Sequence, residues 1–456
     1  MGKDNSIIKV SIITLGCSKN LVDAECMITI LTESGFFVTD QTDDADVIVV
    51  NTCGFIEPAK KEAIDTILTC ADYKKPSGRA DFLIVTGCLP QRYASDILLD
   101  LPEVDAVLGT AHYADIADTI QSLYSDKDST NKSVVSVAGS LDHLRTNRYL
   151  STSSYAWLKI AEGCSNNCAY CAIPIIRGPF ISRPIENIVE EARYIYESGI
   201  REIILAAQDT TDYGIDLYGL RSLPLLLQQI SDISPDIRIR IMYAYMNGIT
   251  DDLIESIANN PQIYHYLDIP IQHADDGVLS QMNRSDTVGF IDRKIAKLRK
   301  RIPDIVLRTT VMVGFPGESD QAINNLISRL RSWQFDHLGC FIFSPEENTS
   351  AFEMDNRVDQ EVASSRFDHV MTMQQDISLH HNLERVGKVY DVTIDSVSED
   401  GIFYKGRSYA EAPDVDPIIY VLATEEELRI GASYPVRIVE ADAYQLTGVT
   451  HNESSQ

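Results

Sequence analysis

Three apolar runs in the first 90 residues each end in a cysteine. The runs are Ile12-Ile-Thr-Leu-Gly-Cys17, Val47-Ile-Val-Val-Asn-Thr-Cys53 and Leu83-Ile-Val-Thr-Gly-Cys88. Each is typical of a buried strand, and stretches with helical periodicity separate them, which predicts a doubly wound parallel sheet. The carboxyl ends of such strands lie along one edge, where ligands bind. We therefore expect cysteines about 35 residues apart in the sequence to converge in space.

A second set of three cysteines, Cys164, Cys168 and Cys171, falls within eight residues. No fourth cysteine follows closely enough to complete a local set of four, so one coordination position is open. Thiolates select iron–sulfur clusters, zinc or cuprous copper. Because a structural zinc site normally has four protein ligands, we favour a cluster and keep zinc as the alternative. The open position would let one iron bind a substrate or cofactor.

The sequence around this second set has the pattern of a βα-repeat domain. Strand-like runs alternate with helical stretches over residues 154–385, and the runs begin at Ala156, Glu202, Ile237, Tyr264, Val306 and Cys340. Six units are too few for a closed eight-stranded barrel, so we expect an open, partial (β/α)6 barrel. In such barrels the loops after the strands carry the chemistry, and residues 164–171 form the first of these loops.

The C-terminal part, residues 387–453, carries five short runs with strict alternation. They predict a small closed antiparallel β-barrel of a kind that often binds oligonucleotides, and this part of the chain resembles a TRAM domain. From Gly387 to Gln456, however, there are 5 Lys or Arg against 13 Asp or Glu. This charge disfavours phosphate contacts, so we interpret the barrel as a substrate-binding domain for a protein.

The whole chain of 456 residues is long enough for about three domains. We expect an α/β protein with an N-terminal cluster domain (1–125), a polar linker (126–153), a βα-repeat domain (154–385) and the C-terminal barrel (387–453). The formal charge of -28 favours basic partners over nucleic acid. No apolar run reaches 18 residues and no cleavable signal pattern is present, which predicts a cytoplasmic protein without a membrane span.

The spacing of Cys164, Cys168 and Cys171, with Tyr170 before the last of them, resembles the signature of the radical AdoMet (S-adenosylmethionine) superfamily. The resemblance implies that these thiolates hold a [4Fe-4S] cluster whose unique iron binds AdoMet. The reduced cluster would then cleave AdoMet to a 5′-deoxyadenosyl radical that abstracts a hydrogen atom.

Over nearly the whole chain, the order of a three-cysteine domain, a radical core and a small barrel is similar to the methylthiotransferases. In that family Cys17, Cys53 and Cys88 would hold a second [4Fe-4S] cluster carrying the sulfur to be donated. The resemblance therefore implies a transferase that converts a C–H bond into a methylthio group with two clusters and AdoMet.

The motif Gln208-Asp-Thr-Thr-Asp-Tyr-Gly214 resembles the branch of this family that modifies a ribosomal protein. We therefore expect the substrate to be the β-carbon of an aspartate in small-subunit ribosomal protein twelve, with a reducing protein such as a flavodoxin as partner. The first alternative is the branch that modifies a tRNA adenosine. The second, from another class, is a non-catalytic iron–sulfur electron carrier with four protein ligands for each cluster.

Five residues are candidates for contact with AdoMet. They are Tyr170, Gln208, Arg183, Arg308 and Gly314. The alternative roles are a plain turn at Gly314, a strand cap at Gln208 and local ion pairs for the two arginines.

Four further residues are expected to be structural. We expect Cys26, Cys70 and Cys340 to be small buried hydrophobes. His273 is expected to be a hydrogen-bonded structural histidine, because the radical step needs no protein base.

Overall fold

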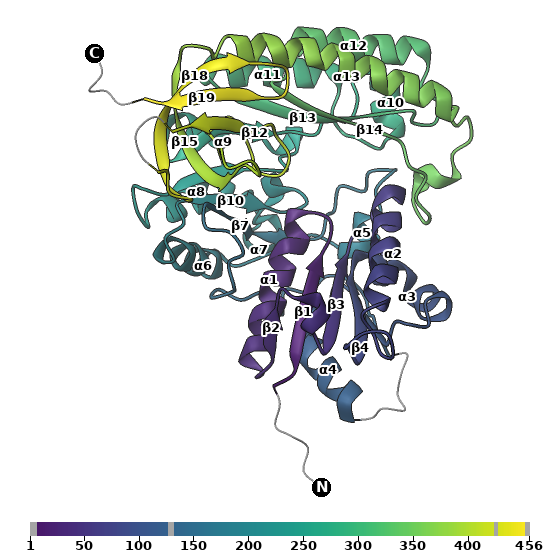
Figure 1. Cartoon of the computed structure of the whole chain (residues 1–456). Coiled ribbons are helices and arrows are strands. Elements are labelled where there is room, and N and C mark those ends of the chain that lie inside the picture. Colours follow the sequence, from purple (N-terminus) through teal and green to yellow (C-terminus); the bar gives the residue numbers. More distant parts are fainter. Residues whose placement is uncertain (1–6, 126–131, 424–426, 452–456) are drawn as a thin grey trace.

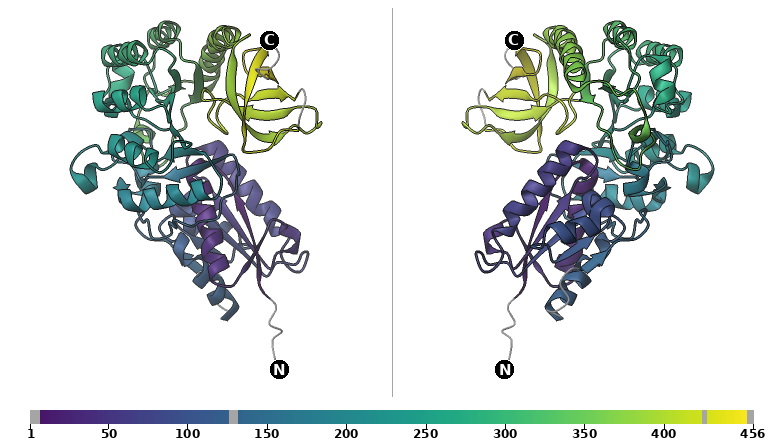
Figure 2. Two further views of the ribbon diagram at one scale, coloured as in Figure 1. Left: turned by 90° about the vertical axis from the view of Figure 1, so that its left-hand side faces the viewer. Right: turned by 90° about the vertical axis from the view of Figure 1, so that its right-hand side faces the viewer.

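The computed structural model describes residues 7–125, 132–423 and 427–451. The chain forms an N-terminal α/β unit, a larger central α/β unit and a small C-terminal β-barrel (Figure 1). Both terminal units lie against the central one (Figure 2). No helix in these described ranges is long and apolar enough to cross a membrane.

The N-terminal unit contains a six-stranded sheet in the order β2-β1-β3-β4-β5-β6, with every pair parallel. Its strands are β1 (Lys9–Thr14), β2 (Phe37–Thr39), β3 (Val47–Thr52), β4 (Phe82–Gly87), β5 (Ala106–Leu108) and β6 (Lys132–Val134). Its helices are α1 (Ser18–Glu33), α2 (Glu57–Ala71), α3 (Cys88–Asp100) and α4 (Ile116–Ser125), with 3-10 turns η1 (Thr42–Asp44) and η2 (Tyr113–Asp115).

Helices cover both faces of this sheet, and β3 shows why. All six of its residues are buried, and alternate side chains point to opposite faces. Val47 and Val49 pack with residues of α1 and α4, whereas Ile48 and Val50 pack with residues of α2 and α3. A parallel sheet covered on both faces requires such continuous apolar runs. The prediction of a doubly wound sheet is therefore confirmed.

The central unit has an open sheet of six parallel strands in the order β14-β13-β12-β11-β10-β7. Its strands are β7 (Tyr155–Lys159), β10 (Glu202–Ala206), β11 (Arg238–Ile241), β12 (Ile263–Asp268), β13 (Val306–Val313) and β14 (His337–Ile342). The longer helices are α6 (Ile185–Glu197), α8 (Leu223–Ser231), α9 (Asp251–Asn259), α11 (Val288–Arg301), α12 (Asp320–Trp333) and α13 (Gln360–Leu383). The expected open partial barrel is confirmed.

Short elements connect the strands of the central unit. They are β8 (Ala161–Glu162), β9 (Ile181–Ser182), α5 (Ile173–Arg177), α7 (Ile215–Tyr218), α10 (Asp276–Gln281), η3 (Thr210–Asp212), η4 (Met246–Gly248) and η5 (Ser350–Glu353). The antiparallel pair β8·β9 frames the loop that holds the second cysteine set, because β8 ends just before this loop and β9 follows α5.

The C-terminal unit is a closed barrel in the order β15-β16-β17-β19-β18. Its strands are β15 (Val389–Val397), β16 (Tyr404–Arg407), β17 (Ile419–Leu422), β18 (Ser433–Ala441) and β19 (Leu446–Thr450). The pair β17·β19 is parallel and the other pairs are antiparallel. An odd number of strands cannot alternate in direction around a closed barrel, so the expected all-antiparallel barrel is corrected at this one pair.

The segment expected to be a polar linker is partly built into the fold. Residues 126–131 lie outside the described residues, but β6 extends the N-terminal sheet beside β5. Farther on, His143 and Arg148 are buried against α1. The polar composition was misleading because these side chains are buried through hydrogen bonds and ion pairs with α1.

Candidate active site

The three N-terminal thiols lie at one edge of the first sheet. Cys17 precedes α1, Cys53 follows β3 and Cys88 opens α3. Gly16 has a φ of +92°, and a Cβ built on it would lie 2.7 Å from the Cβ of Cys53. Only glycine allows the loop after β1 to approach Cys53 this closely. The expected convergence of the three strand ends is therefore present.

Asn20 of α1 connects these strand ends. Its Nδ2 donates hydrogen bonds of 3.0 Å to the carbonyl oxygens of Leu15 and Thr52, which lie just before Cys17 and Cys53. Its Oδ1 accepts from the Sγ of Cys88 at 3.7 Å. One buried amide thus fixes the loops after β1 and β3 and touches the third thiol.

The second thiol set lies in the loop between β8 and α5. Its backbone is held by hydrogen bonds from the N–H of Cys164 to the carbonyl of Gly178 (3.1 Å) and from the N–H of Cys171 to the carbonyl of Cys168 (3.0 Å). Cys168 and Cys171 pack against an apolar cluster that includes the ring of Tyr170. This set is therefore built locally and surrounded by apolar side chains.

The electrostatic surroundings differ between thiols. Burial raises the pKa of Cys53 to about 12 and that of Cys164 to about 11. At Cys17 the surrounding chain also raises the pKa, but the positive charges of Lys19 and Arg177 outweigh this effect, and the net pKa is lowered. Cys17 is thus the thiol in the N-terminal set that forms a thiolate most readily.

A four-iron cluster fits the chemistry of both sets. All nine cysteines are free thiols. Within the described ranges, no group of three or more His, Cys, Asp or Glu side chains could hold a metal ion. In a cluster each thiolate binds a different iron, so its sulfurs surround a common space instead of converging on one ion. Two sets of three soft sulfur donors suit iron–sulfur clusters.

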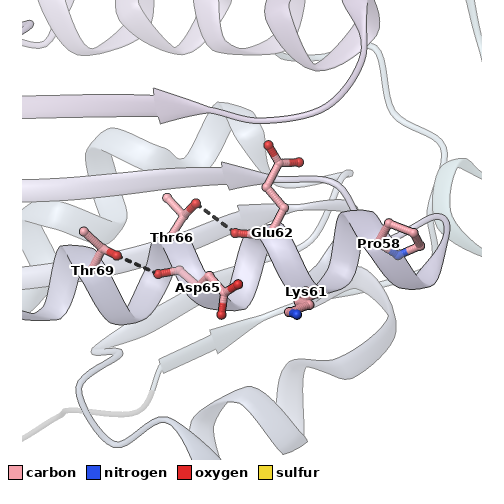
Figure 3. A pocket seen from close by; sticks show the side chains of 6 residues that line it. All are labelled: Pro58, Lys61, Glu62, Asp65, Thr66 and Thr69. Atoms are coloured by element: carbon pink, nitrogen blue, oxygen red, sulfur yellow. Dashed lines mark hydrogen bonds between the residues drawn. The ribbon is translucent and has the colours of Figure 1, made fainter.

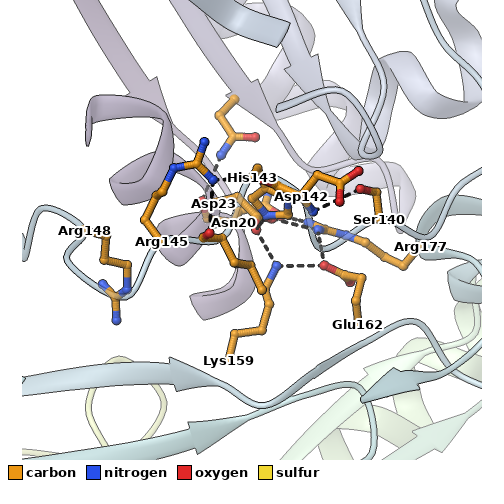
Figure 4. A network of polar contacts seen from close by, with 12 residues as sticks. Asn20, Asp23, Ser140, Asp142, His143, Arg145, Arg148, Lys159, Glu162 and Arg177 are labelled. Carbon is orange, nitrogen blue, oxygen red and sulfur yellow. Dashed lines mark hydrogen bonds and ion pairs between the residues drawn. The ribbon is translucent and has the colours of Figure 1, made fainter. Parts of the chain in front are cut away.

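A buried network of charges joins α1 of the N-terminal unit to β7, β8 and α5 of the central unit (Figure 4). Arg177, the last residue of α5, donates to Asp23 of α1 at 2.7 Å and to Glu162 of β8 at 3.2 Å. It also donates to the Sγ of Cys88 at 3.5 Å. Lys159 donates to Glu162 at 2.7 Å and also pairs with Asp23. Arg177 thus brings a positive charge from the central unit to a thiol of the N-terminal unit.

The network balances its charges away from water. Asp23, Lys159, Glu162 and Arg177 are all almost fully buried, with two positive and two negative side chains. Removal of one member would leave an uncompensated buried charge, which costs about 3–5 kcal/mol. The interface between the two units is therefore sensitive to single substitutions.

Three of the five AdoMet candidates lie near the second thiol set or at strand ends. Tyr170 is buried beside Cys168, and Gln208 donates to Glu162 at 3.0 Å while its buried Oε1 has no partner in the described part of the chain. Gly314, after β13, has a φ of +77°. These three positions are compatible with a bound cofactor.

The two arginine candidates have partners within the chain. Arg183 pairs with Glu191 at 2.7 Å and donates to the carbonyl of Lys159 at 2.6 Å. Arg308 pairs with Asp268 at 2.9 Å and with Asp416 of the C-terminal barrel at 3.2 Å. The structure therefore favours the alternative given above, local ion pairs.

The structural residues are placed as expected with one exception. Cys26, Cys70 and Cys340 are buried in hydrophobic clusters. His273 is fully buried, but neither ring nitrogen has a hydrogen-bond partner in the described ranges, and Glu318 lies 3.6 Å away. The expectation of a hydrogen-bonded histidine is therefore wrong.

A shallow hollow of about 500 Å³ on the outer face of α2 contains none of the candidate site residues (Figure 3). Its threonines, Thr66 and Thr69, donate to backbone carbonyls one turn earlier in the same helix, at 2.8 and 2.9 Å. These hydroxyl groups are therefore already satisfied within the helix.

Four residues of the site were not predicted from the sequence: Asn20, Asp23, Glu162 and Arg177. Their only sequence signal is proximity to the cysteines, since Asn20 follows Cys17 by three residues and Glu162 precedes Cys164 by two. Their partners lie in distant segments, so a pattern along the chain could not identify them.

Three family models match the chain in the order of its structural units. Residues 9–109 match the uncharacterized protein family UPF0004, residues 158–330 match the radical SAM superfamily and residues 386–450 match the TRAM domain. Together these matches cover the two α/β units and the C-terminal barrel.

Solved structures support the fold alone. A radical S-adenosylmethionine methyltransferase, TsrM, from Kitasatospora setae has a TM-score of 0.58 at 11% identity, covering 76% of this chain and 74% of that chain. The cobalamin-dependent radical enzyme OxsB has a TM-score of 0.53 at 11% identity, covering 81% and 56%.

Sequence relatives are far closer. A ribosomal protein uS12 methylthiotransferase RimO from Acetivibrio thermocellus is 46% identical, covering 98% of this chain and 99% of the relative. The protein with the same name from Clostridioides difficile is 44% identical, covering 97% and 98%. At this identity over nearly the full length, the chain belongs to the ribosomal protein uS12 methylthiotransferase RimO family, within the radical SAM superfamily.

Proposed function

We propose that this chain is a radical AdoMet methylthiotransferase that modifies the β-carbon of an aspartate in ribosomal protein uS12. The observation that carries the proposal is the closeness of two three-thiol sets: Cys88 packs against Ala172, the residue after Cys171, and Arg177 contacts both Cys88 and Glu162. Two relatives that share 44–46% of their residues with the chain carry the name of this activity.

We assign the thiols of Cys164, Cys168 and Cys171 to one [4Fe-4S] cluster. The thiols of Cys17, Cys53 and Cys88 are assigned to the other. AdoMet and the two clusters supply the hydrogen-atom abstraction, the methyl group and the sulfur when they are bound. Each thiol set leaves one coordination position without a protein ligand, which is where a small ligand would bind.

The residues of the chain have defined tasks in this proposal. Tyr170 and its apolar neighbours keep water from the second thiol set, which protects a reactive radical. Gln208 is held by Glu162 and presents an unpartnered amide oxygen, a candidate acceptor for AdoMet. Arg177 and Asn20 keep Cys88 in place relative to the second thiol set.

The charge of the C-terminal barrel supports a basic protein substrate over tRNA. Arg407 is one of only 5 basic residues among the last 70, and it is buried between Glu202 and Asp395 at 2.9 and 2.7 Å. These two carboxylates neutralise the charge of Arg407, so it is not available to bind phosphates. An acidic face accelerates encounters with a basic ribosomal protein and repels phosphates.

The setting of the reaction belongs to the same proposal. Because ribosomal proteins are made and assembled in the cytoplasm, we place the enzyme there. A small reducing protein such as a flavodoxin would supply electrons to the clusters.

The test is a comparison of two substrates. The reconstituted enzyme is incubated anaerobically with AdoMet, sulfide and reductant, together with either uS12 or unmodified tRNA. Mass spectrometry should find the methylthio increment on uS12 only. An increment on tRNA only would refute the substrate. Iron bound without any AdoMet turnover would favour the electron-carrier alternative.

A further inference from the structure

Lys19 is a buried cation without an acidic partner. It lies in the first turn of α1, and 8% of its surface is exposed. No carboxylate lies within 4.0 Å of its ammonium group in the described part of the chain. A buried charge without a partner is costly and therefore rare.

The other buried Lys and Arg side chains all have carboxylate partners. These residues are Arg148, Lys159, Arg177, Arg183, Arg240, Arg284, Arg366 and Arg407. The chain carries 67 acidic against 39 basic residues, so carboxylates are plentiful. Lys19 thus lacks a carboxylate partner in a protein that supplies one for every comparable cation in the described ranges.

The surroundings of Lys19 place it between the two α/β units. Its Nζ lies 3.3 Å from the ring centroid of Tyr243, which follows β11 in the central unit. Tyr243 has a φ of +57°, a strained conformation for this residue type, and its hydroxyl group lies 3.1 Å from the Oγ of Ser18. Two residues earlier, the side chain of Cys17 is exposed.

The start of α1 adds to the positive potential at this place. No side chain caps this helix end, and no acidic residue lies in its first turn. The helix dipole favours a negative group there, and the backbone N–H groups of Lys19 and Asn20 are directed at the Cys17 sulfur. An external carboxylate would give the Lys19 ammonium the ion pair that the other buried cations of the described ranges have.

We infer that Lys19 binds the side-chain carboxylate of the substrate aspartate, and thus determines the specificity for aspartate. The inference rests on the proposed function, in which the β-carbon of that aspartate is modified. The carboxyl carbon is bonded directly to the β-carbon. A cation that holds the carboxylate must therefore lie close to the β-carbon and to the groups that react with it. Lys19 meets this condition, because it lies two residues from Cys17 and beside a loop of the central unit.

The test is a binding cycle between Lys19 and the carboxylate. The Kd of uS12 is measured with the AdoMet-loaded, reconstituted enzyme, for uS12 with Asp or Asn at the modified position and for wild type and Lys19→Gln. A charged hydrogen bond to a carboxylate corresponds to about a 30-fold change in Kd. We expect wild type to prefer Asp by about this factor and Lys19→Gln to lose the preference.

Two further variants complete the design. Lys74→Gln is the matched control, because Lys74 lies at the opposite edge of the same sheet and pairs with Asp105 at 2.6 Å. It should keep the preference for Asp. Lys19→Arg should also keep most of it, since the positive charge remains. Should Lys19→Gln fail to fold, the wild type alone decides: equal Kd values for Asp and Asn would overturn the inference.

The outcomes separate this inference from the proposed function. An unchanged preference for Asp in Lys19→Gln would overturn the role of Lys19 while leaving the activity intact. A weaker Kd for AdoMet in Lys19→Gln, with the Asp preference retained, would assign the lysine to the cofactor carboxylate and would also overturn it. Absence of any methylthio product on uS12 with wild type would instead refute the proposed function.

Discussion

The two thiol sets are built in opposite ways. Cys164, Cys168 and Cys171 come from one loop of eight residues in apolar surroundings. The N-terminal thiols come from three separate strand ends and depend on Asn20 and Arg177 for their relative positions. The set in the loop after β8 is therefore a local motif that tolerates changes elsewhere. The N-terminal set is a tertiary arrangement that distant substitutions can disrupt.

The largest expected effect separates the tasks of the two sets. Cys168→Ala should abolish the formation of 5′-deoxyadenosine from AdoMet, because it removes a ligand from the set assigned to AdoMet cleavage. Cys53→Ala should leave some of this cleavage but give no methylthio product. Both products can be quantified by liquid chromatography and mass spectrometry. Full methylthiolation by Cys53→Ala would contradict the assignment of AdoMet cleavage to one thiol set and of sulfur donation to the other.

The second prediction concerns the charged bridge. Arg177→Gln should lower the free energy of unfolding by about 3–5 kcal/mol, because Asp23 and Glu162 lose a buried partner. Urea denaturation measures this loss. Arg177→Gln, combined with Cys164→Ala, should also reduce the amount of iron bound by the N-terminal set.

Arg148→Gln is the matched control for this variant. Arg148 is equally buried and pairs with Glu25 of α1 and Glu191 of α6, but it touches none of the six candidate ligands. Its loss of stability should be similar and its iron content normal. Equal iron loss in both variants would mean that Arg177 acts only through general stability.

The third prediction concerns acid. Burial raises the pKa of Asp23, but the charges of Lys159 and Arg177 and a hydrogen bond from His143 outweigh it, so the net pKa is lowered. Burial lowers the pKa of His143 more than Asp23 raises it. A group whose pKa is lowered in the folded state stabilises the fold at pH values above its ordinary pKa. This contribution to stability is lost as the pH falls.

The free energy of unfolding should therefore decrease below about pH 6.5 through His143 and further below about pH 4 through Asp23. Urea titrations at several pH values measure this profile. His143→Gln should remove the decrease in stability that begins below about pH 6.5 and should keep the decrease below about pH 4. A profile that stays flat down to pH 4 in wild type would contradict the buried, neutral state of His143.

The smallest effect tests the close approach at Gly16. Gly16→Ala places a Cβ 2.7 Å from the Cβ of Cys53 at a φ of +92°, whereas Gly35→Ala has a similar φ of +87° with nothing within 4 Å. We expect a loss of about 1–2 kcal/mol for Gly35→Ala from backbone strain alone. Gly16→Ala should lose more and bind less iron at the N-terminal set. Identical unfolding curves for the two variants would show that the approach to Cys53 has no cost.

The sequence was informative where a feature is local or periodic. The six thiols, the two parallel sheets and the five barrel strands all follow from spacing and alternation. The ion pairs of Arg183 with Glu191 and of Arg308 with Asp416 could not be predicted, because tertiary packing brings these partners together. Lys19 and Arg177 could not be ranked for the same reason, since only the fold shows which buried charge has a partner.

The most direct test of the central claim is the iron content of three forms of the protein after anaerobic reconstitution. One open cluster on each thiol set predicts about eight irons for the wild type. About four should remain in the triple variant Cys164→Ala, Cys168→Ala, Cys171→Ala, and about four in Cys17→Ala, Cys53→Ala, Cys88→Ala. About four irons in the wild type, or a single bound zinc, would contradict the account.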